Sequence, residues 1–189
     1  MQGNGGDDLA VVGAENISLS TVRGGKGFDG VFVSAAETVS GSVVFGDRGV
    51  DDIGVAAETV EFSSIFGGSF EDTTNDGADF IGVDATGSVT ESLIQGNAGN
   101  DAFDIETDLF TRSTMRGGKD DDSLVIEGQF TSDTLFGGLG EDTFRIYNEA
   151  SEVLNSSITG DLGNDTLYIK GDVLTSSVLG GNGDDLIEI

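Results

Sequence analysis

Nine aspartates recur at the same place in a glycine-rich motif, and their type and spacing point to metal binding. Each closes a Gly-x-x-x-x-Asp unit, which the chain repeats from end to end. The aspartates are Asp8, Asp29, Asp51, Asp79, Asp101, Asp122, Asp142, Asp165 and Asp185. Calcium takes about six to eight oxygen ligands, and glycine lets backbone carbonyls approach an ion without side-chain obstruction. The motif therefore predicts calcium sites.

The composition supports calcium and excludes several other partners. The chain has no Cys and no His, so any metal must accept oxygen ligands. Its formal net charge of -27 would oppose compaction unless cations bind. Only eight Lys and Arg are present, which disfavours nucleic acid and anionic membranes. No apolar run predicts membrane insertion or a signal peptide, so an export signal would have to lie elsewhere.

Eight motif copies are uninterrupted and one is not. The first glycines of the eight are Gly3, Gly24, Gly46, Gly96, Gly117, Gly137, Gly160 and Gly180. The ninth copy starts at Gly67-Gly68 and reaches Gly77-Ala78-Asp79 only after an inserted loop, residues 69–75. In another copy Asp120 replaces the fourth-position glycine. These two turns are the doubtful metal sites.

The second and fourth motif positions favour a left-handed backbone. The second position holds only Asn, Asp or Gly, namely Asn4, Gly25, Asp47, Gly68, Asn97, Gly118, Gly138, Asp161 and Gly181. The fourth is glycine except at Asp120. These residue types enter the left-handed region most readily, so we expect positive φ at both positions.

Apolar residues form columns around each motif. The second and fourth residues after the motif aspartate are apolar in every copy, from Ala10 and Val12 to Ile187 and Ile189. Another column precedes each next motif: Val22, Val44, Ile65, Ile94, Met115, Leu135, Ile158 and Val178. Two residues before it stands Ser20, Ser42, Ser63, Ser92, Ser113, Asp133, Ser156 or Ser176. This alternation predicts two short strands per repeat, each with a buried face.

Each repeat of 20 to 23 residues is too short to bury its own apolar face. We therefore expect an all-β solenoid of about eight to nine stacked coils, forming one domain over residues 1–189. Length varies mainly at the turn opposite the motif. Because neither end carries a cap, we expect a segment of a longer protein, or end-to-end stacking of copies.

The nonapeptide from Gly24 to Phe32 resembles the RTX, or hemolysin-type calcium-binding, repeat, and the segment from Gly180 to Glu188 matches it at every position. This resemblance covers essentially the whole chain. It implies a right-handed parallel β-roll with calcium between neighbouring turns, held by the nine aspartates and by backbone carbonyls. The implied carbonyls belong to Gly3, Gly5, Gly24, Lys26, Gly46, Arg48, Gly96, Ala98, Gly117, Lys119, Gly137, Leu139, Gly160, Leu162, Gly180 and Asn182.

Nine turns leave gaps for up to about eight ions. In the family's commonest form both edges of the roll bind calcium, whereas here only one edge carries the motif. We expect a single calcium row, because opposite turns such as Gly13-Ala14-Glu15-Asn16 lack the glycine spacing.

Other chemistries fit less well. A catalytic carboxylate pair should be local rather than ninefold, and the serines have no His or evident Lys as an activating base. The outward Ser and Thr residues are too irregular for an ice-binding array. Phe45, Phe66 and Phe136 are hypothesised either to pack across adjacent coils or to form a patch for a neighbouring subunit. An enzyme would need a cleft, most plausibly at the loop from Ser69 to Asn75.

We therefore expect a non-enzymatic, calcium-dependent scaffold of a secreted or cell-surface protein, such as an adhesin, surface-layer, matrix or filament component. Its partners would be calcium and either copies of itself or other surface proteins and glycans. The family resemblance also implies a bacterial origin. It suggests an alternative, the C-terminal secretion and folding domain of a toxin, protease or lipase whose catalytic part is absent here.

Overall fold

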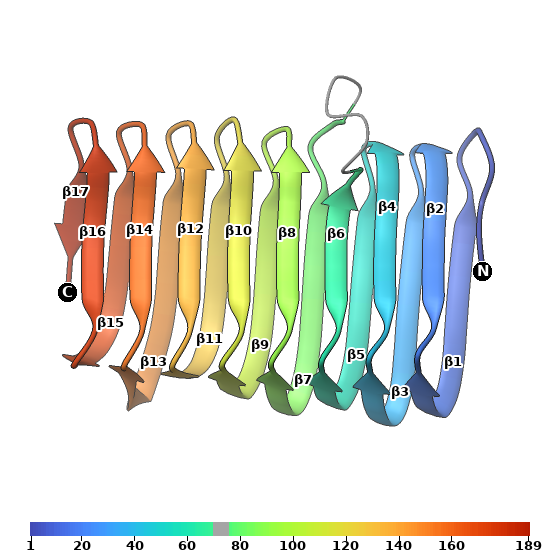
Figure 1. Cartoon of the computed structure of the whole chain (residues 1–189), viewed down its shortest axis with the longest axis horizontal. Coiled ribbons are helices and arrows are strands. Elements are labelled where there is room, and N and C mark those ends of the chain that lie inside the picture. Colours follow the sequence, from blue (N-terminus) through green and yellow to red (C-terminus); the bar gives the residue numbers. More distant parts are fainter. Residues whose placement is uncertain (70–75) are drawn as a thin grey trace.

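The computed structural model describes residues 1–69 and 76–189, with no side-chain description at 148–151. Most of the predicted inserted loop, residues 70–75, thus lies outside the described part. The described residues form two parallel sheets and no helix (Figure 1). It follows that this part of the chain has no helix that could cross a membrane.

A nine-stranded sheet and an eight-stranded sheet face each other along the whole molecule. The first consists of β1 (Leu9–Ser18), β3 (Gly30–Ser40), β5 (Asp52–Glu61), β7 (Phe80–Thr90), β9 (Ala102–Thr111), β11 (Ser123–Thr131), β13 (Thr143–Leu154), β15 (Thr166–Leu174) and β17 (Leu186–Glu188). The second consists of β2 (Thr21–Gly27), β4 (Val43–Gly49), β6 (Ser64–Gly68), β8 (Leu93–Ala98), β10 (Thr114–Lys119), β12 (Thr134–Leu139), β14 (Ser157–Leu162) and β16 (Ser177–Asn182).

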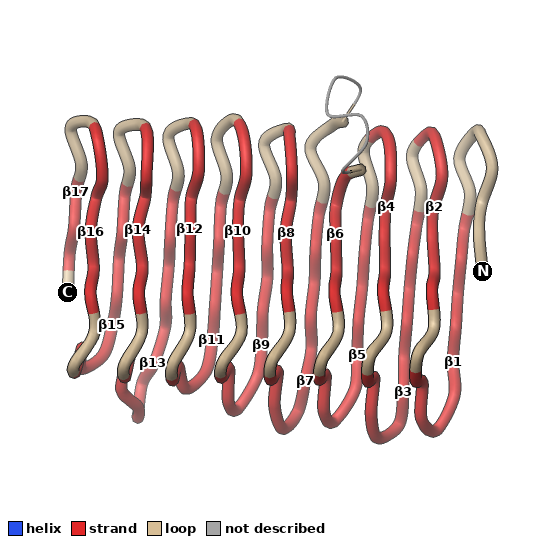
Figure 2. Tube along the Cα trace, in the orientation of Figure 1, coloured by secondary structure: helices blue, strands red, loops and turns tan. Residues whose placement is uncertain are grey.

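Consecutive strands alternate between the sheets, and each strand pairs in parallel with its counterpart one coil away. The predicted parallel β-solenoid is confirmed. The termini lie at opposite ends of the row of coils (Figure 1). The glycine turns form one edge, and the other edge is where the odd-numbered strands bend back (Figure 2).

One detail of the prediction was wrong, because the odd-numbered strands are not all short. From β1 to β15 they run for nine to twelve residues, since they continue around the turn opposite the motif. The register shifts there, for example between Ala14 and Asn16 and between Ser34 and Thr38. Each shift absorbs the variable length without disturbing the columns on either side.

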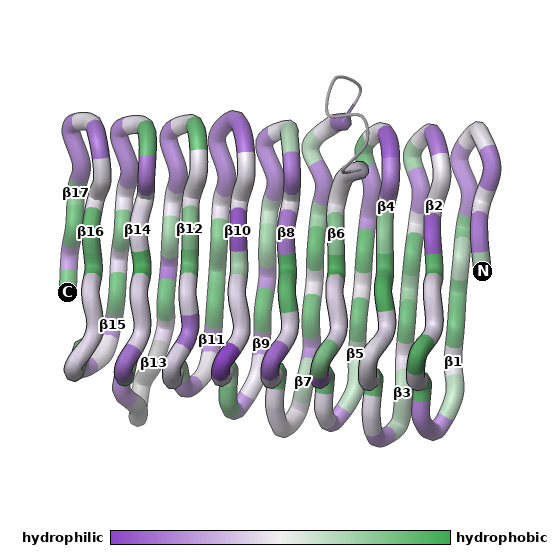
Figure 3. Tube along the Cα trace, in the orientation of Figure 1, coloured by the Kyte–Doolittle hydropathy of each residue, from purple (hydrophilic) through white to green (hydrophobic). Residues whose placement is uncertain are grey.

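The predicted apolar columns fill the space between the sheets, and Figure 3 shows them as green bands on both. Ile53, Ile81 and Phe144 are fully buried, as are Ile94 and Leu135 on the opposite sheet. Burial fails only near the ends of the row. In the last coil, for example, the Ile187 and Ile189 side chains are 41% and 66% exposed.

A sharp corner precedes each even-numbered strand, and the serine column holds it. The Ser63 hydroxyl accepts the Ser42 N–H at 3.2 Å and donates to the Glu61 carbonyl at 2.9 Å. The serine hydroxyls thus form a hydrogen-bonded ladder along these corners. In every coil, the residue just before the serine, or before Asp133, has positive φ. These residues are Leu19, Gly41, Phe62, Glu91, Arg112, Ser132, Asn155 and Thr175. Residue type does not mark these positions, because only one of the eight is glycine.

The outward phenylalanines pack locally. The Phe45 and Phe66 rings stack with centroids 5.0 Å apart, and the Arg23 guanidinium lies 3.9 Å from the Phe45 centroid. Arg116 lies similarly over Phe136, at 5.1 Å. The hypothesis of packing across adjacent coils accounts for these rings.

Candidate metal centre

The nine motif aspartates stand in one row along the glycine-turn edge, each between a turn and the following odd-numbered strand. In eight successive steps one carboxylate oxygen, Oδ1, accepts the N–H of the aspartate in the preceding coil, at 2.7 to 3.0 Å. This ladder fixes the orientation of the eight carboxylates from Asp29 to Asp185. It also leaves the second oxygen, Oδ2, free to point elsewhere.

Seven of the Oδ2 atoms are buried and have no hydrogen-bond partner. They belong to Asp29, Asp51, Asp79, Asp101, Asp122, Asp142 and Asp165, all at most 2% exposed. An unpaired buried carboxylate oxygen is strongly destabilising unless a proton or a cation compensates it. A row of such oxygens therefore indicates that cations bind there.

The first glycine of each motif shows where the unpaired oxygens point. A Cβ on Gly24 would lie 2.8 Å from the Asp29 Oδ2 and 2.6 Å from the Gly46 carbonyl oxygen of the next coil. The same pair of oxygens recurs beside the first glycine from coil to coil. Carboxylate and carbonyl oxygens thus face a common space, which any larger residue would fill.

Burial governs the pKa values of these carboxyls. Desolvation raises the pKa of Asp51 to about 7, of Asp79 to about 9 and of Asp101 to about 8. It likewise raises the pKa of Asp122 to about 8 and of Asp142 to about 6. Neighbouring carboxylates raise each value further, whereas the backbone hydrogen bond lowers it. Without cations, the row cannot be fully ionised at neutral pH.

The donor set fits calcium. All the candidate ligands are oxygens, and carboxylate and backbone carbonyl oxygens are the ligands that calcium prefers. Among residues 1–69 and 76–189, no three acidic side chains gather into a metal-binding group. An ion in this row would therefore depend on backbone oxygens to complete its coordination.

The structure also places the predicted third-position carbonyls. The Lys26 carbonyl accepts the Gly6 N–H at 2.7 Å, and the Leu162 carbonyl accepts the Gly140 N–H at 2.9 Å. Gly5, Arg48, Ala98, Lys119, Leu139 and Asn182 hold the equivalent position in their own coils. At Lys26 and Leu162 one carbonyl lone pair serves the inter-coil ladder, and the second lone pair remains for an ion.

The two ends of the row differ from its middle. The Asp8 Oδ2 accepts the Asn4 N–H at 2.9 Å, so it is already paired. Both Asp8 and Asp185 are only partly buried. The terminal aspartates thus have less need of a cation than the seven between them.

The prediction of positive φ holds at most positions and fails at three. Gly25, Asp47 and Asn97 adopt it, and so does Asp120, with φ of 71°. Asn4, Gly68 and Gly77 do not. Gly68 and Gly77 flank the insertion, which separates them in sequence.

Each doubtful turn keeps its place in the row. A Cβ on Gly46 would lie 2.5 Å from the Gly67 carbonyl oxygen, and a Cβ on Gly67 would lie 2.5 Å from the Asp79 Oδ2. In the Asp120 turn, Gly117 faces the Asp122 Oδ2 and the next carbonyl as in other coils. Gly67 was left out of the predicted ligands, although the motif marks it as the first glycine of the interrupted copy.

Asp76, just after the insertion, was also missed. Its carboxyl lies directly against Gly68, and both oxygens are buried without a well-formed hydrogen bond. Desolvation raises its pKa to about 7, although nearby backbone N–H groups, including that of Ala98, lower it in part. The insertion obscured this residue, which takes the third position of the interrupted motif directly after residues 69–75.

Comparison of the chain with protein-family models, with curated proteins and with solved structures finds no match in any of the three.

Proposed function

We propose that this chain is a calcium-dependent structural module, a β-roll that becomes rigid when calcium binds between its glycine turns. The observation that carries this proposal is the row of buried, unpaired Oδ2 atoms, each facing a carbonyl oxygen of the next coil. When bound, calcium would supply the positive charge that this row lacks. The motif aspartates and the first-glycine carbonyls would hold it.

The overall charge supports the same proposal. Eight divalent ions would change the formal net charge from -27 to about -11. This would relieve much of the self-repulsion that opposes a compact state. Because a metal that binds only the folded state adds its binding free energy to stability, folding and calcium binding would be coupled.

The remaining buried polar groups support a structural role. The serine hydroxyls of the corner ladder donate to backbone carbonyls, for example Ser92 to the Thr90 carbonyl at 2.9 Å and Ser156 to the Leu154 carbonyl at 2.9 Å. We propose no catalytic step for them. The proposal includes an extracellular or surface setting, where calcium is plentiful, and partners among copies of the chain or other surface molecules.

The direct test is the number of calcium ions bound per chain, measured by calorimetric titration and by metal analysis after dialysis. We expect up to about eight ions per chain, fewer ions for Asp101→Asn, and little binding of magnesium, which demands smaller octahedral sites. The matched control is Asp104→Asn, which makes the same charge change on the exposed face of β9. Absence of saturable calcium binding would sink the proposal, as would equal binding by the two variants.

A further inference from the structure

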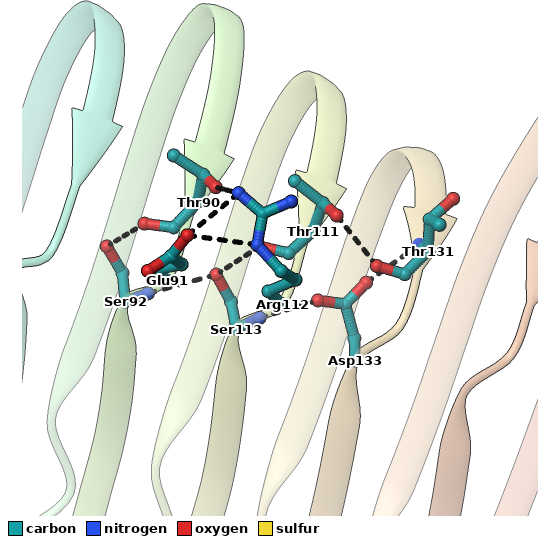
Figure 4. A network of polar contacts seen from close by, with 8 residues as sticks. All are labelled: Thr90, Glu91, Ser92, Thr111, Arg112, Ser113, Thr131 and Asp133. Carbon is teal, nitrogen blue, oxygen red and sulfur yellow. Dashed lines mark hydrogen bonds and ion pairs between the residues drawn. The ribbon is translucent and has the colours of Figure 1, made fainter.

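One carboxyl interrupts the serine ladder at the corners of the roll. Asp133 stands at the corner between β11 and β12, where the equivalent residue of the other coils is serine. Its side chain is 2% exposed. Figure 4 shows it in line with Ser92 and Ser113 of the preceding coils. The residue lies at the opposite end of β12 from the aspartate row, so the calcium proposal does not account for it.

Serine and aspartate make different hydrogen bonds at this position. The Ser156 hydroxyl accepts the Asp133 N–H at 3.1 Å and donates to the Leu154 carbonyl at 2.9 Å. The Asp133 carboxylate instead accepts twice, from the Ser113 N–H at 2.7 Å and from the Thr131 N–H at 2.8 Å. Every serine of the ladder after Ser20 both accepts and donates, but an ionised aspartate has no proton to donate.

A threonine supplies the donor that the ionised aspartate lacks. In the serine corners, the carbonyl two residues earlier accepts the serine hydroxyl, as at Leu154. Here that carbonyl belongs to Thr131, and it accepts the Thr111 hydroxyl at 2.8 Å (Figure 4). A protonated Asp133 would regain a hydroxyl able to donate to the same carbonyl. The corner therefore has two hydrogen-bond arrangements that differ by one proton.

The charges that face Asp133 are few. Arg112, on the preceding corner, favours the ionised form, but its guanidinium is already paired with Glu91 at 2.8 Å. On the following coil the contact is the neutral Ser156 hydroxyl. Burial outweighs Arg112 and raises the pKa of Asp133 to about 7. Both protonation states are thus accessible near neutral pH.

We propose that Asp133 makes the β11–β12 corner a proton-responsive joint of the roll. Protonation turns a double acceptor into a serine-like donor and acceptor, and ionisation reverses the change. Because the folded state holds the proton more tightly than the unfolded chain, this corner is most stable in acid. It loses stability as pH rises from about 4 through about 7.

The test follows the backbone amide resonances of Ser113 and Thr131 between pH 5 and 8.5, in saturating calcium so that the roll stays folded. We expect both resonances to shift with one midpoint near pH 7 and to stop shifting in Asp133→Ser. In Thr111→Val the midpoint should rise, because the Thr131 carbonyl would keep only the Arg112 N–H as a donor and could accept the protonated carboxyl. A purely structural aspartate would not respond to the Thr111 change.

A second readout compares unfolding midpoints. The unfolding midpoint of Asp133→Ser should exceed that of the natural chain by more at pH 8 than at pH 5. Asp133→Asn should likewise lack the loss of stability that Asp133 causes as pH rises. Amide resonances that stay constant across this range would overturn the proposal. So would failure of Asp133→Ser to fold, because serine is the stated equivalent of the protonated form.

Discussion

Replacing Asp122 with asparagine removes one charge from the middle of the buried row while keeping the side chain's shape. The asparagine oxygen can still accept the Asp101 N–H, which now pairs with Oδ1 at 2.8 Å. The change therefore isolates the unpaired Oδ2. Its effect on stability should have opposite signs in the absence and in the presence of calcium.

Without calcium, the variant should be more stable at neutral pH. The folded state raises the pKa of Asp122 to about 8, whereas the unfolded chain ionises it near 3.8. Because pH 7 lies about three units above the unfolded pKa, keeping the proton costs the folded state about 1.4 kcal/mol for each unit. Asparagine avoids this cost, so the gain is about 4 kcal/mol as an upper limit. The gain should vanish below about pH 4, where both states are protonated.

With calcium, the variant should be less stable. One ion at 100 times its dissociation constant stabilises the fold by about 2.7 kcal/mol, and the variant would lose at least that much if a single site fails. Urea unfolding with calcium, and the β-sheet signal by circular dichroism in chelator at pH 4, 6 and 7, measure the two effects. Asp104→Asn controls for the change in net charge. If Asp122→Asn destabilises the chain equally under all these conditions, the carboxylate is only a hydrogen-bond acceptor and the reasoning is refuted.

Three further outcomes are expected. Gly117→Ala should weaken calcium binding, since its Cβ would fill the space between carboxylate and carbonyl oxygens. Gly82→Ala should be tolerated, because its Cβ would press only on the Phe80 ring. Calorimetric titration of the two variants with calcium measures this difference. Ser63→Ala leaves the buried Ser42 N–H without its acceptor and should lower the free energy of unfolding by about 1 to 3 kcal/mol in urea titrations. The metal-free chain should show more β-sheet signal by circular dichroism at pH 5 than at pH 8, because the raised pKa values of the row favour the protonated fold. An unchanged or reversed order would contradict this.

Repetition is what made the fold predictable from the sequence. A single apolar pair such as Ile53 and Val55 fits many structures. The same pair at the same offset from every motif aspartate fixes the strands, their register and the row of carboxylates. The serine column was predictable for the same reason.

The features that sequence reasoning missed do not repeat, or they leave no mark on residue type. Phe62 and Arg112 adopt positive φ although they are neither Gly nor Asn, because the adjacent serine hydrogen bonds impose the corner on whatever residue precedes it. Asp76 directly follows an insertion that no other copy of the motif contains. The bonding at the Asp133 corner involves Thr111, one coil away, whose hydroxyl donates to the Thr131 carbonyl. The sequence of one coil does not show which residue of the next lies beside it.

The central claim is that calcium folds the roll, and circular dichroism during a calcium titration of chelator-treated protein near pH 7.5 tests it most directly. We predict a cooperative gain of β-sheet signal with calcium and no comparable gain with magnesium at the same concentration. A full β-sheet signal in chelator, unchanged by calcium, would contradict the account, because the unpaired oxygens of the row would then need no cation.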